Sequence, residues 1–89
     1  MDEVNIQKLK HFYGALNNEN RLKIILLCQD KGLTVTQLSK RLKLNYNITS
    51  EYIGMLAKVG LVTRTRNANK TVTIRSLVKI KEDGTVNRI

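Results

Sequence analysis

This 89-residue chain has few of the residue types on which many small proteins rely for stability. It has no proline and no tryptophan, and aromatic residues make up only 4% of it, so aliphatic side chains have to form the core. Its single cysteine, Cys28, cannot form an internal disulfide or a cysteine-based zinc site, and its apolar neighbours favour a plain core role. The length suits a single domain, which we place at residues 1–89.

Signals for export, membrane insertion and catalysis are also missing. Met1-Asp2-Glu3 is acidic and no apolar run follows it, so we expect no signal peptide. No stretch approaches the roughly 18 apolar residues of a membrane span. We therefore expect an intracellular, nucleoid-associated protein without a membrane partner. No nucleophile–base pair or carboxylate dyad indicates an enzyme. The lone His11 favours a surface or interface role, so we predict neither a metal nor a cofactor.

Acidic residues are scarce as well, and this is the first indication of function. The chain has 7 Asp and Glu against 16 Lys and Arg, a formal net charge of +9. Such an excess favours a polyanionic partner through counterion release, without choosing between DNA, RNA and an anionic membrane. The basic residues concentrate in the second half, where Glu51 is the only acid between Lys40 and Lys81.

Apolar periodicity predicts four helices. The first, over residues 5–16, has one apolar face. The second runs from the Asn18 cap to about residue 31, with Gly32 as its stop, and is apolar nearly all round, as expected of a central buried helix. Thr34 and Gln37 fit a capping box that opens a third helix ending near residue 42. After a turn at Lys43-Leu44, a fourth helix begins at the Asn45 cap and ends near Val59.

After Gly60 the pattern changes to the alternation of strands. Residues 62–66 and 71–75 are compatible with two strands, joined by a turn at residues 67–70. Val78 and Ile80 continue the alternation, and Asp83-Gly84 is a hairpin-turn signal. A further short strand through Val86 and a frayed end are equally compatible with this tail, residues 76–89.

Residues 33–61 resemble the helix-turn-helix of the ArsR-like winged helix-turn-helix regulators. The resemblance covers roughly residues 9–74. It rests on the spacing of these positions: Arg21-Leu22-Lys23-Ile24-Ile25, Leu38, Leu44, Ser50, Ile53, Leu56 and Gly60-Leu61-Val62. It implies a mainly α fold with a β-hairpin wing: a three-helix core, the order α-α-α-α-β-β, a helix-turn-helix at residues 34–59 and a wing at residues 61–75. The paired cysteines of the family's metal site are absent, because Gln37, Ser39 and Lys40 occupy that region.

On a helical projection, the fourth helix has an apolar side and a polar side, the arrangement that a helix in the DNA major groove requires. The apolar side consists of Ile48, Tyr52, Ile53, Met55, Leu56 and Val59. On the polar side we predict base contacts from Tyr46, Asn47, Ser50 and Glu51. Glu51 has the wrong charge for DNA, so pairing with Lys58 or Arg41 remains an alternative for it. Gly54 leaves a gap on this side, where DNA or a partner can approach the backbone.

The other predicted contacts are to the DNA backbone, which fix position without reading sequence. By resemblance Thr49 lies close to the DNA. The full set of predicted DNA-binding residues is Thr36, Gln37, Lys40, Arg41, Lys43, Asn45, Tyr46, Asn47, Thr49, Ser50, Glu51, Lys58, Arg64, Arg66, Asn69 and Lys70.

We predict a homodimer that binds double-stranded DNA with two such helices, at half-sites about one helical turn apart. The dimerisation helix is residues 1–16, with Ile6, Leu9, Phe12 and Tyr13 at the interface, and the C-terminal strand is a further candidate. Two other functions remain open: a protein-interaction adaptor, which has no need for so many basic residues, and a non-specific architectural DNA- or RNA-binding protein.

Overall fold

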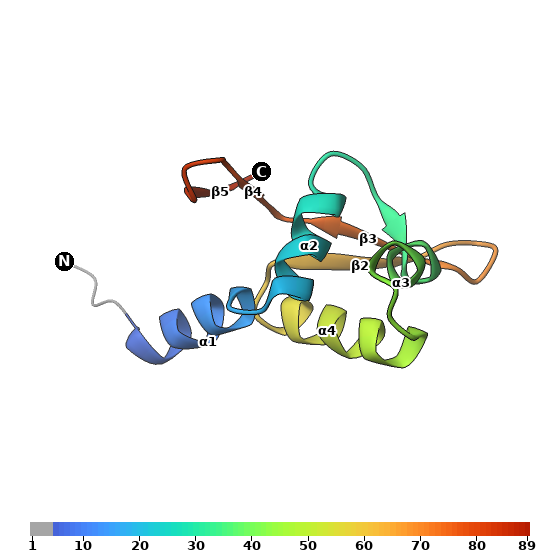
Figure 1. The fold of residues 1–89 in the computed structure, drawn as a ribbon, viewed down its shortest axis with the longest axis horizontal. Coiled ribbons are helices and arrows are strands. Elements are labelled where there is room, and N and C mark those ends of the chain that lie inside the picture. Colours follow the sequence, from blue (N-terminus) through green and yellow to red (C-terminus); the bar gives the residue numbers. More distant parts are fainter. Residues whose placement is uncertain (1–4) are drawn as a thin grey trace.

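The computed structural model describes residues 5–89, and its elements follow the predicted order (Figure 1). The N-terminal residues 1–4 of the predicted dimerisation segment lie outside this range. The elements are α1 (Ile6–Leu16), α2 (Glu19–Cys28), β1 (Leu33–Thr34), α3 (Val35–Leu42), α4 (Tyr46–Lys58), β2 (Val62–Arg66), β3 (Val72–Ser76), β4 (Val78–Ile80) and β5 (Val86–Arg88). Helices α1 to α4 and the β2–β3 hairpin confirm the predicted fold class.

Polar caps define where each helix begins. The side chains of Asn5, Asn18, Thr34 and Asn45 each accept a hydrogen bond from a backbone N–H in the first turn of the helix that follows. At Thr34 the capping box is complete, because the Gln37 side chain also accepts a hydrogen bond from the Thr34 backbone N–H at 2.9 Å. The caps predicted at Asn18, Thr34 and Asn45 are therefore confirmed.

The end of α2 was predicted wrongly. The helix stops at Cys28, and Gly32 lies beyond it rather than at its end. A Cβ atom on Gly32 would lie 2.5 Å from the Cγ2 atom of Thr73 in β3. Glycine suits this position because Gly32 lies beside β3, where the side chains of Thr73 and Arg75 occupy the space of a Cβ atom, and not because it terminates a helix.

The core lies between α2, the helix-turn-helix and the sheet. Its fully buried members come from most elements: Ile24, Ile25, Leu38, Ile53, Leu56, Leu61, Ile74 and Val78. α2 is less enclosed than its composition suggested, since Leu26 is 49% exposed. Leu26 lines a surface groove between α2 and the C-terminal strands.

The wing belongs to a three-stranded antiparallel sheet of order β1-β3-β2. Val62 pairs with Ser76 and Arg66 with Val72, so the two long strands are in register over their whole length. The short strand β1, which the sequence analysis did not predict, adds to the sheet through the pairs Leu33–Ile74 and Thr34–Thr73. The strand that leads into the helix-turn-helix is thereby paired with the middle of β3.

The tail forms a second, two-stranded sheet rather than a frayed end. β4 and β5 pair antiparallel, from Val78–Arg88 to Ile80–Val86. Gly84 has a positive φ of 86° in the turn, as the Asp83-Gly84 signal indicated. Hydrogen bonds from Thr85, from both side chain and backbone, lower the pKa of the Asp83 carboxyl. None of the helices over residues 5–89 is long and apolar enough to cross a membrane.

Candidate nucleic-acid interface

Helix α4 has one buried side and one exposed side. Ile53 and Leu56 are buried, whereas Tyr46, Asn47, Glu51 and Lys58 are exposed and Ser50 is half-buried. The four predicted base-contacting side chains thus lie within the first half of the helix, and three of them are exposed. Figure 1 places α4 on the outside of the molecule, with its N-terminus near α3.

The structure corrects the predicted position of three α4 side chains. Thr49, predicted to lie close to DNA, is 0% exposed, and its hydroxyl donates a hydrogen bond to the Asn45 carbonyl at 2.9 Å. Ile48 and Met55, predicted to be buried, are 36% and 52% exposed. Thr49, Ile53 and Leu56 follow the spacing i, i+4, i+7, so the buried stripe passes through Thr49 and leaves Ile48 and Met55 outside it.

The predicted phosphate contacts on α3 and the following turn are all exposed. Thr36 and Gln37 lie in the first turn of α3, where backbone N–H groups and the helix dipole favour an anion. Lys40 and Arg41 lie in its last turn. Lys43 forms the C-cap in the left-handed conformation, with φ of 57°, and this reverses the chain direction towards α4.

The wing carries its cations on the same surface as α4. Arg64, Arg66, Asn69 and Lys70 are exposed, and Lys70 has a positive φ of 68° in the turn. The Asn67 side-chain amide holds this turn by donating to the hydroxyls of Thr71 and Thr73 at 2.9 and 2.7 Å. One guanidinium nitrogen of Arg64 lies 4.0 Å from the position that a Cβ of Gly54 would occupy, so the base of the wing adjoins the exposed side of α4.

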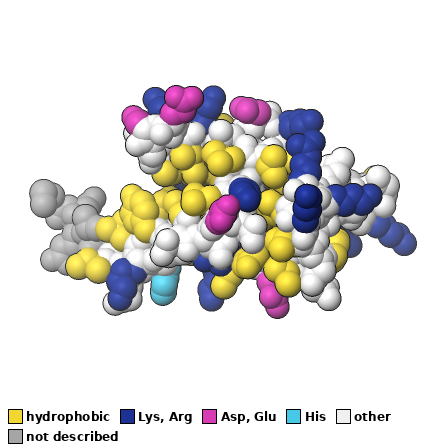
Figure 2. Space-filling view, viewed as in Figure 1, with side chains coloured by type: hydrophobic (Ala, Val, Ile, Leu, Met, Phe, Trp, Pro, Cys, Tyr) yellow, Lys and Arg dark blue, Asp and Glu magenta, His cyan; other side chains and the backbone are white. Residues whose placement is uncertain are grey.

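Within residues 5–89 the only ion pair joins Lys23 to Glu19 on α2, at 3.1 Å. Glu51 therefore pairs with neither Lys58 nor Arg41, which were the alternatives to its facing DNA. Basic side chains gather at the α3 and wing end of the molecule in Figure 2, where few acidic side chains are visible. The charge of this surface suits a polyanion.

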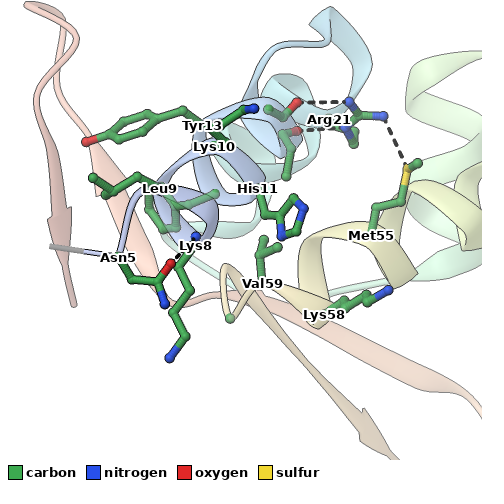
Figure 3. Close-up of a pocket in the computed structure, with 14 residues that line it drawn as sticks. Asn5, Lys8, Leu9, Lys10, His11, Tyr13, Arg21, Met55, Lys58 and Val59 are labelled. Carbon is green, nitrogen blue, oxygen red and sulfur yellow. Dashed lines mark hydrogen bonds between the residues drawn. The ribbon is translucent and has the colours of Figure 1, made fainter.

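The predicted dimer residues lie on α1. Ile6, Leu9 and Tyr13 are 67%, 41% and 58% exposed, while Phe12 is half-buried and packs edge-to-face on Tyr13 with ring centroids 5.1 Å apart. A groove of about 1020 Å³ separates α1 from the C-terminal end of α4 (Figure 3). All four residues thus lie on α1, and Ile6, Leu9 and Tyr13 are exposed.

Sequence reasoning missed the role of Arg21, which appeared only as a member of the family pattern. Its guanidinium donates to the carbonyls of Ala15 and Gly14 at 2.7 and 3.2 Å, and to the Met55 sulfur at 3.3 Å. It also lies over the Tyr52 ring, 5.5 Å from the centroid. Arg21 therefore connects α1, α2 and α4, and the sequence carried no local signal for contacts with residues so distant along the chain.

Little in residues 5–89 has the chemistry of a metal centre. This part of the chain holds no group of three His, Cys, Asp or Glu residues close enough to share an ion. The Cys28 thiol is buried, and burial raises its pKa from 9.0 to about 11. Such a thiol is a poor ligand and a poor nucleophile at neutral pH, because it remains protonated.

Comparison with known proteins decides which fold family this arrangement represents. A family model described as winged helix-turn-helix matches residues 20–79, which contain α3, α4 and the wing. The chain belongs to the winged helix-turn-helix family. It is also 32% identical, over 79 residues, to the transcriptional activator HlyU of Vibrio cholerae, a match that covers 89% of this chain and 73% of HlyU.

Solved winged helix-turn-helix structures show the same fold. HlyU from Vibrio cholerae aligns with a TM-score of 0.75 at 33% identity, covering 84% of this chain and 80% of HlyU. The homodimeric winged helix-turn-helix DNA-binding domain of Mb0332 from Mycobacterium bovis, a possible ArsR-family regulator, aligns with a TM-score of 0.75 at 21% identity, covering 85% and 75% of the two chains. The protein is thus a transcription regulator built on a winged helix-turn-helix domain.

Proposed function

We propose that this protein is a homodimeric regulator that recognises specific double-stranded DNA sequences, with α4 in the major groove and the β2–β3 wing along the adjacent backbone or minor groove. One observation carries the proposal. The first half of α4 carries polar side chains at the surface, and the two elements packed beside it, α3 and β2, carry exposed cations. Polar groups in the centre suit base edges, and cations around them suit phosphates.

The base-reading group is Tyr46, Asn47, Ser50 and Glu51. An asparagine can form two hydrogen bonds with an adenine, and a glutamate can accept one from a cytosine amino group. Glu51 supports sequence-specific recognition in particular. A surface that bound only phosphate would be weakened by an exposed carboxylate at its centre.

Phosphate contacts come from the side chains that surround this group. They are Thr36, Gln37, Lys40, Arg41, Lys43, Asn45, Lys58, Arg64, Arg66, Asn69 and Lys70. The side-chain oxygens of Gln37 and Asn45 already serve as helix caps, so these two residues offer DNA their amide N–H groups.

Dimerisation would bring two copies of α4 to one duplex. The exposed stripe of Ile6, Leu9 and Tyr13 on α1 is an apolar surface of the kind that a second copy covers. Mb0332, a protein with the same fold, is a homodimer, and this supports a dimeric state for the present chain.

The test is selection of bound sequences from a random duplex pool, followed by affinity measurements on the selected site. We expect a palindrome or near-palindrome, because a two-fold symmetric dimer presents identical surfaces to both half-sites. Replacing Asn47 and Ser50 by alanine should reduce the preference for the selected site by about 10-fold or more, since each good base contact contributes about 1–3 kcal/mol of discrimination.

The matched control is Asn87→Ala, which removes an exposed amide on β5, outside the proposed contact set. It should leave both specific and non-specific affinity unchanged. Equal losses of specific and non-specific binding in the Asn47 and Ser50 variant would instead indicate an architectural protein. Absence of duplex binding by the wild type would indicate a protein-interaction adaptor.

A further inference from the structure

Helix α1 is attached to the rest of the molecule at only one end. Every residue from Ile6 to His11 is exposed, and the buried residues of α1 are Ala15 and Leu16 at its C-terminus. In Figure 1 the N-terminal half of α1 extends away from the other helices. The direction of α1 therefore depends on what holds its last turn.

Phe12, Ala15 and Leu16 pack this end of α1 on the core, and Arg21 adds polar contacts to it. The carbonyls of Gly14 and Ala15 belong to the last turn of α1, where carbonyl groups lack partners within the helix and the helix dipole is negative. The Arg21 guanidinium donates to both of them, and its positive charge suits this end of the helix (Figure 3). The Gly14 carbonyl also accepts a hydrogen bond from the Asn17 backbone N–H at 3.1 Å, so Arg21 is its second donor. Because the guanidinium is planar and rigid, two such bonds constrain orientation as well as distance.

The same guanidinium also contacts α4. Its third nitrogen donates to the Met55 sulfur at 3.3 Å, and its central carbon lies 5.5 Å from the centroid of the Tyr52 ring. One side chain thus binds the end of the proposed dimerisation helix and two positions on the proposed DNA-reading helix. Arg21 is half-buried, and its bond to the Ala15 carbonyl is partly shielded from water, whereas its bonds to Gly14 and Met55 are exposed.

We propose that Arg21 is a positioning residue that sets the angle between α1 and α4, and thereby the spacing of the two DNA half-sites that the dimer accepts. An 11-residue helix is about 16 Å long, so a tilt of about 10° at its Arg21 end moves the far end by roughly 3 Å. Two protomers would double this displacement to roughly 6 Å, whereas successive base pairs are separated by about 3.4 Å. The spacing part of this inference rests on the proposed function, but the angle between the helices does not.

The first experiment measures the helix angle without DNA. Spin labels on Gln7→Cys in α1 and Asn47→Cys in α4, in a Cys28→Ala background, report the distance between the two helices. Labelled protein is diluted into unlabelled protein so that distances within one protomer dominate. We expect one narrow distance distribution with Arg21, and a distribution at least about twofold broader with Arg21→Met, which keeps an extended apolar stem but loses the charge and the donors.

Three further variants separate positioning from general stability. Lys23→Gln removes an equal charge from an exposed ion pair on the same helix, and should leave the distribution narrow. Met55→Leu removes only the acceptor on α4, and should broaden the distribution without loosening the cap of α1. Arg21→Lys keeps the charge without the planar group, and should give intermediate widths. If Arg21→Met fails to fold by circular dichroism, Met55→Leu and Arg21→Lys carry the test.

The second experiment measures affinity for paired half-sites separated by different numbers of base pairs. The wild type and Lys23→Gln should prefer one spacing by about tenfold, whereas Arg21→Met should discriminate less than about threefold while binding a single half-site normally. Unchanged distance widths in Arg21→Met, or an unchanged spacing preference, would overturn the role of Arg21. A wild type with a narrow distance distribution but no spacing preference would contradict the dimeric function and leave the positioning of α1 standing.

Discussion

Burial in the fold lowers the reactivity of the Cys28 thiol. It is 2% exposed, and desolvation raises its pKa to about 11, an effect that a backbone hydrogen bond with Leu33 partly offsets. At pH 8 only about one thiol in a thousand would be ionised at that pKa. We expect iodoacetamide to modify Cys28 in unfolded protein and to leave it almost unmodified in the native state, as mass spectrometry would show.

The same raised pKa predicts how stability depends on pH. A thiol whose pKa is higher in the folded state disfavours folding only when it ionises, so its contribution is constant below pH 9.0 and falls as the pH rises toward about 11. The free energy of unfolding from urea denaturation should decrease over this interval more in the wild type than in Cys28→Ala. An identical decrease in both proteins would show that Cys28 is not its cause.

Two glycines should respond to alanine with opposite signs. On Gly32 the new Cβ would lie 2.5 Å from the Thr73 Cγ2 atom, an overlap that should cost about 1–3 kcal/mol. On Gly54 it would meet only the Arg64 guanidinium, at 4.0 Å, and the gain in helix propensity should stabilise the protein by about 1 kcal/mol. Urea denaturation of the two variants checks both signs, and a stabilised Gly32→Ala would contradict the close packing of this loop on β3.

The wing is the element whose contribution to DNA binding can be measured most directly. Replacing Arg64, Arg66 and Lys70 with glutamine should reduce the slope of log affinity against log salt by up to about 2.7, since each phosphate neutralised contributes about 0.9. Affinity for all sequences should fall together, because phosphate contacts carry no sequence information.

The matched control for the wing replaces Lys79, Lys81 and Arg88 with glutamine. These exposed cations lie on or next to the β4–β5 hairpin, and their loss changes net charge by the same amount. The control should retain most of the wild-type slope. Equal flattening in both variants would show that net charge, and not the wing, governs binding.

Local sequence signals predicted helices better than they predicted strand partners. Thr34 and Asn45 cap helices through hydrogen bonds that span only three residues, so the local sequence is enough to predict these caps. The strand β1 had no such signal. Its two residues become a strand only because β3, about 40 residues later, presents a free edge to them. Its existence therefore depends on non-local pairing.

Self-association is a property of the whole molecule, and α1 is where we expect it. Replacing Leu9 and Tyr13 with glutamate would place charges in the exposed apolar stripe and should yield a monomer by sedimentation equilibrium. The melting temperature of the wild type should rise with protein concentration, whereas that of the variant should not. Affinity for the palindromic site should fall to that of a single half-site.

The control for dimerisation is Ala68→Glu, which places a charge on an exposed side chain in the turn of the wing, away from α1 and from the C-terminal hairpin. It should leave the wild-type oligomeric state unchanged. A variant at Leu9 and Tyr13 that remains dimeric would exclude α1 as the interface and direct attention to the groove between α2 and the C-terminal hairpin, where Leu26 is exposed.

The amino-acid sequence alone predicted the order of the helices, their caps, the wing and the basic half of the chain. Each of these features depends on spacing or charge within a short stretch. The other features of the molecule depend on its tertiary structure. Thr49 is buried because the buried stripe of α4 packs on the core, and Gly32 has no room for a Cβ atom because side chains of the neighbouring strand β3 lie against it. Arg21 joins three helices through contacts that form only once distant segments have packed together.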